Sequence, residues 1–231
     1  MPIGLARAVI TSVTTVASLA LPSAISPTVS GGTPTTLDSQ QVASVAAGDT
    51  LVSLCAGSRD ATAPTWAAAV AKWSGTPSFD VLFGDNYVVS TQSSHMAAGL
   101  YAVPGALTNA AATHTWGSSM WGPVFGLIRI LGPAVSHQLS PAATKGATGT
   151  SLTATFGVTP AADSLIIGLV HHRDDNDFTL PADWAVLFSE NASANSTTKA
   201  IARIGAHGSA TVTGLASGSV ASMRLIELRR P

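Results

Sequence analysis

Side chains that can bind metal ions or move protons are concentrated in one run of seven residues, His171-His172-Arg173-Asp174-Asp175-Asn176-Asp177. Two imidazoles and three carboxylates so close together could ligate a divalent cation, with an oxygen-rich set for calcium or a mixed set for zinc. The spacing argues against both, because the run has neither the D-x-[DN]-x-[DN]-G loop with its distal glutamate nor an H-E-x-x-H pattern. We interpret the run as a solvated loop between two strands, with an ion site as the alternative.

Other residues that could take part in catalysis are scattered along the chain. An acid/base pair of carboxylates would need folding to bring together two of Asp80, Asp85, Asp183 and Glu190 with different pKa values. The remaining histidines lie apart in the sequence, at His95, His114, His137 and His207. The chain has no G-x-S-x-G elbow, no phosphate-binding G-x-x-x-x-G-K-[ST] loop and no G-x-G-x-x-G fingerprint. We therefore expect no enzymatic activity, no catalytic residue, no metal and no cofactor.

The tryptophans divide into two groups. Trp66 and Trp184 each follow a proline at the end of a similar stretch, so we expect both to pack in a core. Trp116 and Trp121 lie instead in HTWGSSMWGP, a loop rich in glycine and serine. Exposed aromatic side chains on such a loop can stack on sugar rings or anchor a protein interface. Trp116 and Trp121 are therefore the candidate ligand or interface residues, and local packing over the end of a sandwich is the alternative.

The elements that must position these residues are predicted to be strands. Short runs rich in Val, Ile, Leu and Thr alternate with clusters of Gly, Pro, Asn, Asp and Ser, which is typical of an antiparallel all-β protein. The predicted strands are Ala8–Val16, Gln41–Val45, Thr50–Ala56, Phe79–Phe83, Met96–Val103, Val124–Leu131, Ser151–Phe156, Ser164–His171, Ala185–Ser189, Lys199–Gly205, Ala210–Thr213 and Ser222–Leu228. A helix competes with a strand only at Thr65–Trp73, where alanine is abundant.

Two stretches of the chain resemble each other. AAGDTLVSLCAGSRDATAPTW and PAADSLIIGLVHHRDDNDFTLPADW share small residues, an aspartate, an apolar strand, a polar loop and a proline shortly before tryptophan. We predict an N-terminal arm or strand extension (1–36), two tandem β-sandwich repeats of the jelly-roll or immunoglobulin-like class (37–133 and 148–231) and a linker between them (134–147). Either each repeat is a small sandwich or the two together close one, because a sheet needs a second layer to bury its apolar face.

Composition limits the partners of the chain. Charged residues make up 10% of it, and Lys+Arg 11 against Asp+Glu 12 leave a formal net charge of -1. So little basic charge argues against binding to nucleic acid or to an anionic membrane surface. We also expect no transmembrane helix, and an uncleaved strand or arm rather than a signal peptide, because Thr and Ser interrupt the apolar stretch after Arg7. The single cysteine, Cys55, excludes an intrachain disulfide and is expected to be a buried, inert thiol.

A low-charge β-sandwich rich in Ala, Gly, Ser and Thr, with this sequence of strand, proline, tryptophan and closing strand, resembles the surface proteins of tailed bacteriophage particles. That group includes head decoration, head fibre and tail-associated modules. The resemblance implies a non-enzymatic structural protein located in the virion, which decorates or cements the capsid. Its partners would be copies of itself, in a trimer or another symmetric homo-oligomer, and other capsid or virion proteins. The alternative is a carbohydrate- or receptor-binding module of a tail or fibre, acting through Trp116, Trp121, Tyr87 and Tyr101.

Overall fold

The structure is a computed structural model that describes residues 19–59, 67–73, 75, 77–90, 92–146, 148–174, 177–192 and 196–231. These residues form antiparallel strands and contain no α-helix, which confirms the predicted all-β fold. No helix long and apolar enough to cross a membrane is therefore found among them. The described part of Thr65–Trp73 contains the short strand β5 (Val70–Ala71), so the helical alternative is wrong for these residues.

Two large sheets form the centre of the molecule. The first main sheet has the order β1 (Thr28–Val29), β10 (Trp121–Ile130), β4 (Thr50–Arg59), β7 (Gln92–Ala102), β6 (Asp80–Val89). The second main sheet has the order β11 (Val135–Leu139), β18 (Ala221–Arg229), β14 (Leu165–His172), β16 (Thr197–Ile204), β15 (Ala185–Asn191), and β12 (Ala143–Lys145) also pairs with β18. Apart from the added strand β12, the two sheets have the same strand order: β1, β10, β4, β7 and β6 occupy the positions that β11, β18, β14, β16 and β15 occupy in the second sheet.

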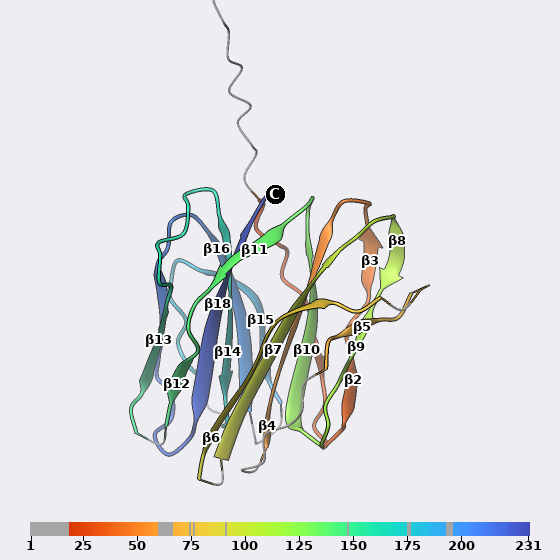
Figure 1. The fold of residues 1–231 in the computed structure, drawn as a ribbon. Helices are drawn as coiled ribbons and strands as arrows, with labels where there is room; N and C mark the ends of the chain where they lie inside the picture. The colour runs from red at the N-terminus through yellow and green to blue at the C-terminus, as the bar shows by residue number, and fades with distance from the viewer. Residues whose placement is uncertain are drawn as a thin grey trace, which may run out of the picture.

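Smaller sheets cover the outer face of each main sheet (Figure 1). The first main sheet is covered by β2 (Thr36–Asp38), β9 (Ala112–Thr115) and β5, and by the pair β3 (Val42–Val45) and β8 (Leu107–Ala110). The second is covered by the pair β13 (Ser151–Thr155) and β17 (Ser209–Thr213). Each half of the chain is therefore a two-layer sandwich. The common strand order supports the tandem duplication, which stays a prediction.

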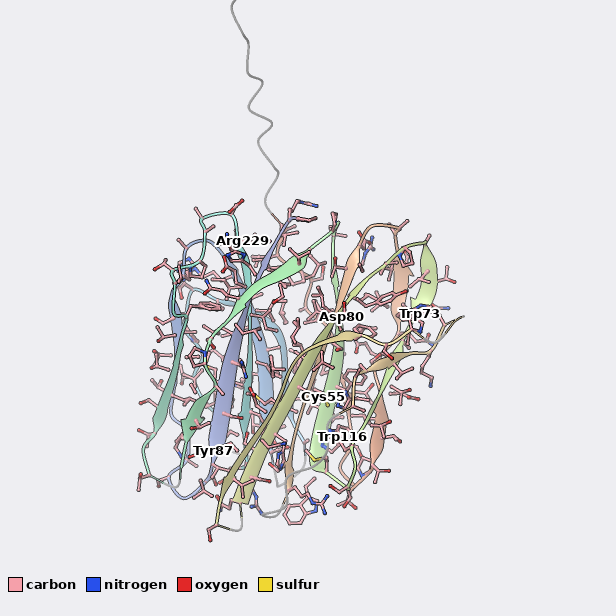
Figure 2. The ribbon with its side chains drawn as sticks, viewed as in Figure 1. Cys55, Trp73, Asp80, Tyr87, Trp116 and Arg229 are labelled. Carbon is pink, nitrogen blue, oxygen red and sulfur yellow. The ribbon has the colours of Figure 1, made fainter. Side chains whose placement is uncertain are left out.

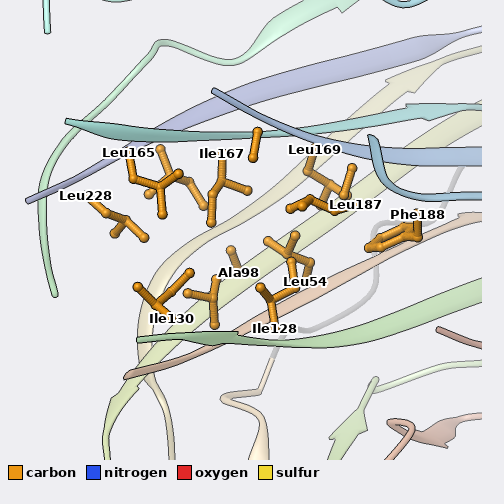
Figure 3. Close-up of a cluster of buried hydrophobic side chains, with 14 of the residues drawn as sticks. Leu54, Ala98, Ile128, Ile130, Leu165, Ile167, Leu169, Leu187, Phe188 and Leu228 are labelled. Atoms are coloured by element: carbon orange, nitrogen blue, oxygen red, sulfur yellow. The ribbon is translucent and has the colours of Figure 1, made fainter. Parts of the chain in front are cut away.

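The two sandwiches are joined through their main sheets. One cluster of buried side chains draws on both sheets, with Leu54, Ala98 and Ile128 from the first and Leu165, Ile167 and Leu169 from the second (Figure 3). A second cluster lies entirely within residues 152–225 and a third within residues 45–127. Strands β4 and β14 are thus buried on both faces, which is why their sequences are nearly continuous apolar runs.

The predicted linker is part of the second sheet. Residues 134–147, predicted as a linker, contain β11 and β12, which pair with β18. Strands this short have no clear alternation of polar and apolar residues, and the Pro and Ser around them favour a loop prediction.

The described part of the N-terminal arm packs on its own molecule. Residues 1–18, and with them the predicted strand Ala8–Val16, lie outside the described residues. Leu19 is buried in the central cluster, and the N–H of Ile25 donates to the carbonyl of Leu187 at 2.7 Å. Farther along, Thr28 and Val29 pair with β10. Residues 19–29 therefore run between the edges of the two main sheets, from β15 to β10.

Candidate functional sites

The histidines of the polar run lie in a strand and not in a loop. Alternation along β14 places His171 on the face toward the first main sheet and His172 on the outer face, and both are fully buried. Nε2 of His171 lies 3.0 Å from the Ser58 hydroxyl, and Nδ1 lies 2.9 Å from the Thr198 hydroxyl. The interpretation of a solvated loop is wrong for these two residues. Arg173 and Asp174 follow the strand and are half-buried, and Asp177 is exposed.

A serine hydroxyl, a histidine ring and a threonine hydroxyl in this order resemble the hydrogen-bonded chain of a hydrolase, but the arrangement here is enclosed. Ser58, His171 and Thr198 each have no exposed surface, and burial holds the pKa of His171 well below its ordinary value. A neutral ring can accept a hydrogen bond at one nitrogen and donate one at the other, so it links the two hydroxyls. Nearby, the hydroxyls of Ser94 and Ser222 lie 2.5 Å apart. These five residues form the polar end of the interface between the main sheets.

The groups around His172 hold a loop in place. Burial, followed by the charge of Lys145, lowers the pKa of His172 to about 4. The Lys145 ammonium group is itself buried and donates to the carbonyls of Gly146, Ala216 and Ser219 at 3.0, 2.9 and 2.6 Å. Ser219 in turn donates to Asp174 at 3.0 Å. Within the described part of the chain, no three His, Cys, Asp or Glu side chains converge as a metal site would require.

The four candidate carboxylates are distributed over both main sheets. Asp80 and Asp85 belong to β6 of the first main sheet, whereas Asp183 precedes β15 of the second and Glu190 lies in it. Asp85 accepts hydrogen bonds from Arg224 at 2.6 and 2.7 Å, and Asp183 is paired with Arg203. Two of the four are therefore engaged in separate ion pairs, which does not favour a shared acid/base role.

The candidate tryptophans differ in exposure. Trp116 is 2% exposed and packs in the outer core of the first half, with its ring 5.3 Å from that of His114 (Figure 2). Trp121 is half-buried, and the Arg173 guanidinium lies 5.2 Å from its ring centroid. The burial of Trp116 favours the packing alternative for this residue. Trp184 is buried as expected, whereas Trp66 lies outside the described residues.

The two tyrosines lie far from each other on the first main sheet. Tyr87 pairs in register with Ser94 of β7, whereas Tyr101 lies on β7 itself, seven residues farther along. At the rise of a β-strand this separates the two positions by roughly 20 Å. The Tyr101 ring packs against Trp73 and Phe79, with centroids at 5.4 and 5.5 Å. Tyr87 and Tyr101 therefore do not form one binding surface, and Tyr101 belongs to the core of the first half.

A groove that the sequence analysis did not identify lies beside the open edge of β10. It has a volume of about 390 Å³. The groove is lined by residues from three segments: Ala20, Leu21, Pro22, Ser23 and Ile25 of the arm, Val42, Ala43 and Ser44 of β3, and Leu127 and Arg129 of β10 with Leu131 directly after it. Among the described residues, Arg129 is the one charged residue that lines it. The sequence did contain an indication, because Pro22 and Pro27 lack the N–H that pairing with a neighbouring strand requires.

Arg129 is held at the groove by fixed contacts. Its Nε donates to the Asp49 carboxylate at 2.6 Å and its Nη1 to the carbonyl of Ser44 at 2.7 Å. Burial opposes ionisation of Asp49, but the N–H groups of Gly132 and Ala46, together with Arg129, hold the pKa of this carboxyl below its ordinary value. The guanidinium charge is thereby paired, and the groove is mainly apolar.

Comparison with models of protein families, with curated protein sequences and with solved structures gives no match to this chain.

Proposed function

We propose that this chain is a non-enzymatic structural protein that acts through contacts with other protein chains. The observation that carries the proposal is the groove, because it runs along an open sheet edge, and sheet edges are surfaces on which proteins bind extended segments of other chains. The surroundings of the side chains that the sequence analysis considered for catalysis or metal binding also favour this role. His171 and His172 are buried in packing, and Asp174 accepts a hydrogen bond from Ser219.

The low charge of the chain supports self-association. With 10% charged residues, the surface has little electrostatic repulsion to keep copies apart. Several large apolar side chains are exposed, among them Leu21 at 46% and Leu131 at 53%, and both line the groove. We propose symmetric homo-oligomers as the working form. By resemblance, their setting is the surface of a phage-like particle, where the protein decorates or cements the capsid.

The test is peptide mass spectrometry on density-banded particles from the source. We expect the chain to band with a major capsid protein at a high copy ratio. A low copy ratio would replace capsid decoration by a tail or vertex location. Absence of the chain from every particle would refute the virion role. The alternative of a carbohydrate-binding module is not proposed, because Trp116 is buried and Tyr87 lies far from Tyr101.

A further inference from the structure

The side of β10 that faces away from β4 is only partly paired. Strand β1 covers this side at Val124 and Phe125 alone. At Leu127, the Gln40 side chain takes the place of a strand, donating to the carbonyl at 2.6 Å and accepting from the N–H at 3.1 Å. Alternate residues of a strand direct their backbone groups to the same side, so Arg129 also presents its N–H and carbonyl there. Among the described residues, no strand pairs with β10 at this position.

The arm runs past this edge without pairing to it. Pairing of Thr28 with Phe125 and of Val29 with Val124 fixes an antiparallel direction, in which Pro22 to Pro27 run alongside the second half of β10. The two prolines cannot donate to a ladder, and the Ile25 N–H is directed to Leu187 of the other main sheet. The arm therefore leaves the edge of β10, and the groove lies between them.

From this edge we infer that the groove binds the segment Ala8–Val16 of a second copy of the chain as an added β-strand. Seven of the nine residues in AVITSVTTV are β-branched, and the segment contains no charge, proline or glycine. Such a composition favours extended backbone and suits an apolar groove beside an open edge. In the sequence, the segment ends three residues before Leu19. Leu19 is buried in the central core, and the next residue, Ala20, lines the groove.

A second copy fits as the donor better than the same molecule. For its own segment to enter the groove, the chain would have to reverse direction between Val16 and Ala20, because Ala20 already lines the groove. The intervening Ala17, Ser18 and Leu19 include no Gly, Asn or Asp, the residues that favour the positive φ of a two-residue reversal between strands, and Leu19 is buried. Exchange between copies avoids this turn. It also uses the same segment and the same groove in every subunit, as a symmetric oligomer requires.

The inference deepens the proposed function and rests on it, because it names the contact that makes the homo-oligomer. Its test uses two full-length variants, Val13→Cys and Ala43→Cys, produced together in one cell and oxidised. We expect a disulfide between the two different chains and a native mass that is a multiple of 23.2 kDa. The native Cys55 is 1% exposed and does not compete. A monomeric mass would overturn the inference, and so would a disulfide found only within one chain when both cysteines are placed on it.

A matched pair of substitutions tests the groove without disturbing the core. Leu131 and Val158 are 53% and 70% exposed, and only Leu131 lines the groove. We expect Leu131→Glu to shift the full chain to monomers by light scattering, and Val158→Glu to leave the oligomer intact, with unchanged far-ultraviolet circular dichroism for both. Equal behaviour of the two variants would contradict the inference.

Particle banding is measured separately, so an oligomer absent from particles refutes only the virion role, and a monomer found on particles refutes only the exchange.

Discussion

The interface between the two main sheets has two different ends. One end is a set of aliphatic side chains that includes Ile130, Leu165 and Leu228 (Figure 3). The other end is the polar set of Ser58, Ser94, His171, Thr198 and Ser222, which is equally buried. Aliphatic contacts stabilise the pair of sheets but tolerate sliding, whereas hydrogen bonds are directional. The contacts of Ser58 with His171 and of Ser94 with Ser222 each join one sheet to the other. The comparison suggests that stability comes mainly from the aliphatic end and alignment from the polar end.

Acid should act on the polar end and the buried histidines, and this effect is the largest we expect. Burial lowers the pKa of His95, His114 and His172 to about 4, and that of His171 well below its ordinary value. Between pH 6.5 and 4 the unfolded chain therefore binds more protons than the folded chain, so stability falls as pH falls. The three histidines with a pKa of about 4 each contribute on the order of 1–2 kcal/mol at pH 5, which sums to several kcal/mol. Urea denaturation at pH 7 and pH 5 measures the loss.

Two histidine substitutions, one buried and one exposed, test whether the loss of stability in acid comes from the buried rings. His171→Asn should move the acid unfolding midpoint to lower pH, because it removes a buried group that resists protonation. His137 is exposed on β11, so His137→Asn should leave the midpoint in place. If both variants shifted the midpoint equally, the acid response would not arise from the buried ring.

Truncation of a side chain at the aliphatic end should lower the free energy of unfolding by about 3 kcal/mol. Ile167 is fully buried and packs in the central cluster, so Ile167→Ala removes buried methyl groups and leaves a cavity. Chemical denaturation measures the change in the free energy of unfolding. Val186→Ala is the control, because Val186 is 44% exposed and its truncation should change stability by less than about 1 kcal/mol.

Substitution at the polar end should have a smaller effect on stability and a larger one on alignment. Thr198→Val keeps the shape of the side chain but leaves Nδ1 of His171 without the hydroxyl partner, at a cost of about 1–2 kcal/mol. Amide hydrogen exchange along β14 and β16 should then increase near this end alone. Uniform loss of protection along both strands would show that the polar end does not act locally.

The ion pair between the sheets should matter least. Arg224 of β18 donates to Asp85 of β6, and both side chains are about one-fifth exposed, at 19% and 21%. Solvent screening limits the contribution of such a pair, so Asp85→Asn should destabilise by about 1 kcal/mol or less. Denaturation at low and high salt checks the assignment, because the difference between the parent and the variant should shrink as salt is added.

Long strands were predictable because both of their faces are buried. Strands β4 and β14 stand out as continuous apolar runs, and every strand predicted from Gln41 onward overlaps a strand of the structure. The sequence does not predict the short strands β1, β2, β8, β9, β11 and β12, because they consist of two to five residues whose pairing is decided by neighbours distant in the sequence. The predicted strand ends at His171, and the sequence places His172 in a solvated loop, because polarity alone does not distinguish a solvated residue from a buried one with partners.

The sequence by itself determined the all-β class, the position of the long strands and the low charge, since these follow from local composition and from alternation of side chains. Tertiary structure alone decided that the two sandwiches share one interface. It also decided that Ser58 lies against His171, 113 residues away, and that the arm leaves an open edge on β10. These features depend on contacts between strands far apart in the chain. No local pattern encodes such contacts, because each partner fits an ordinary strand on its own.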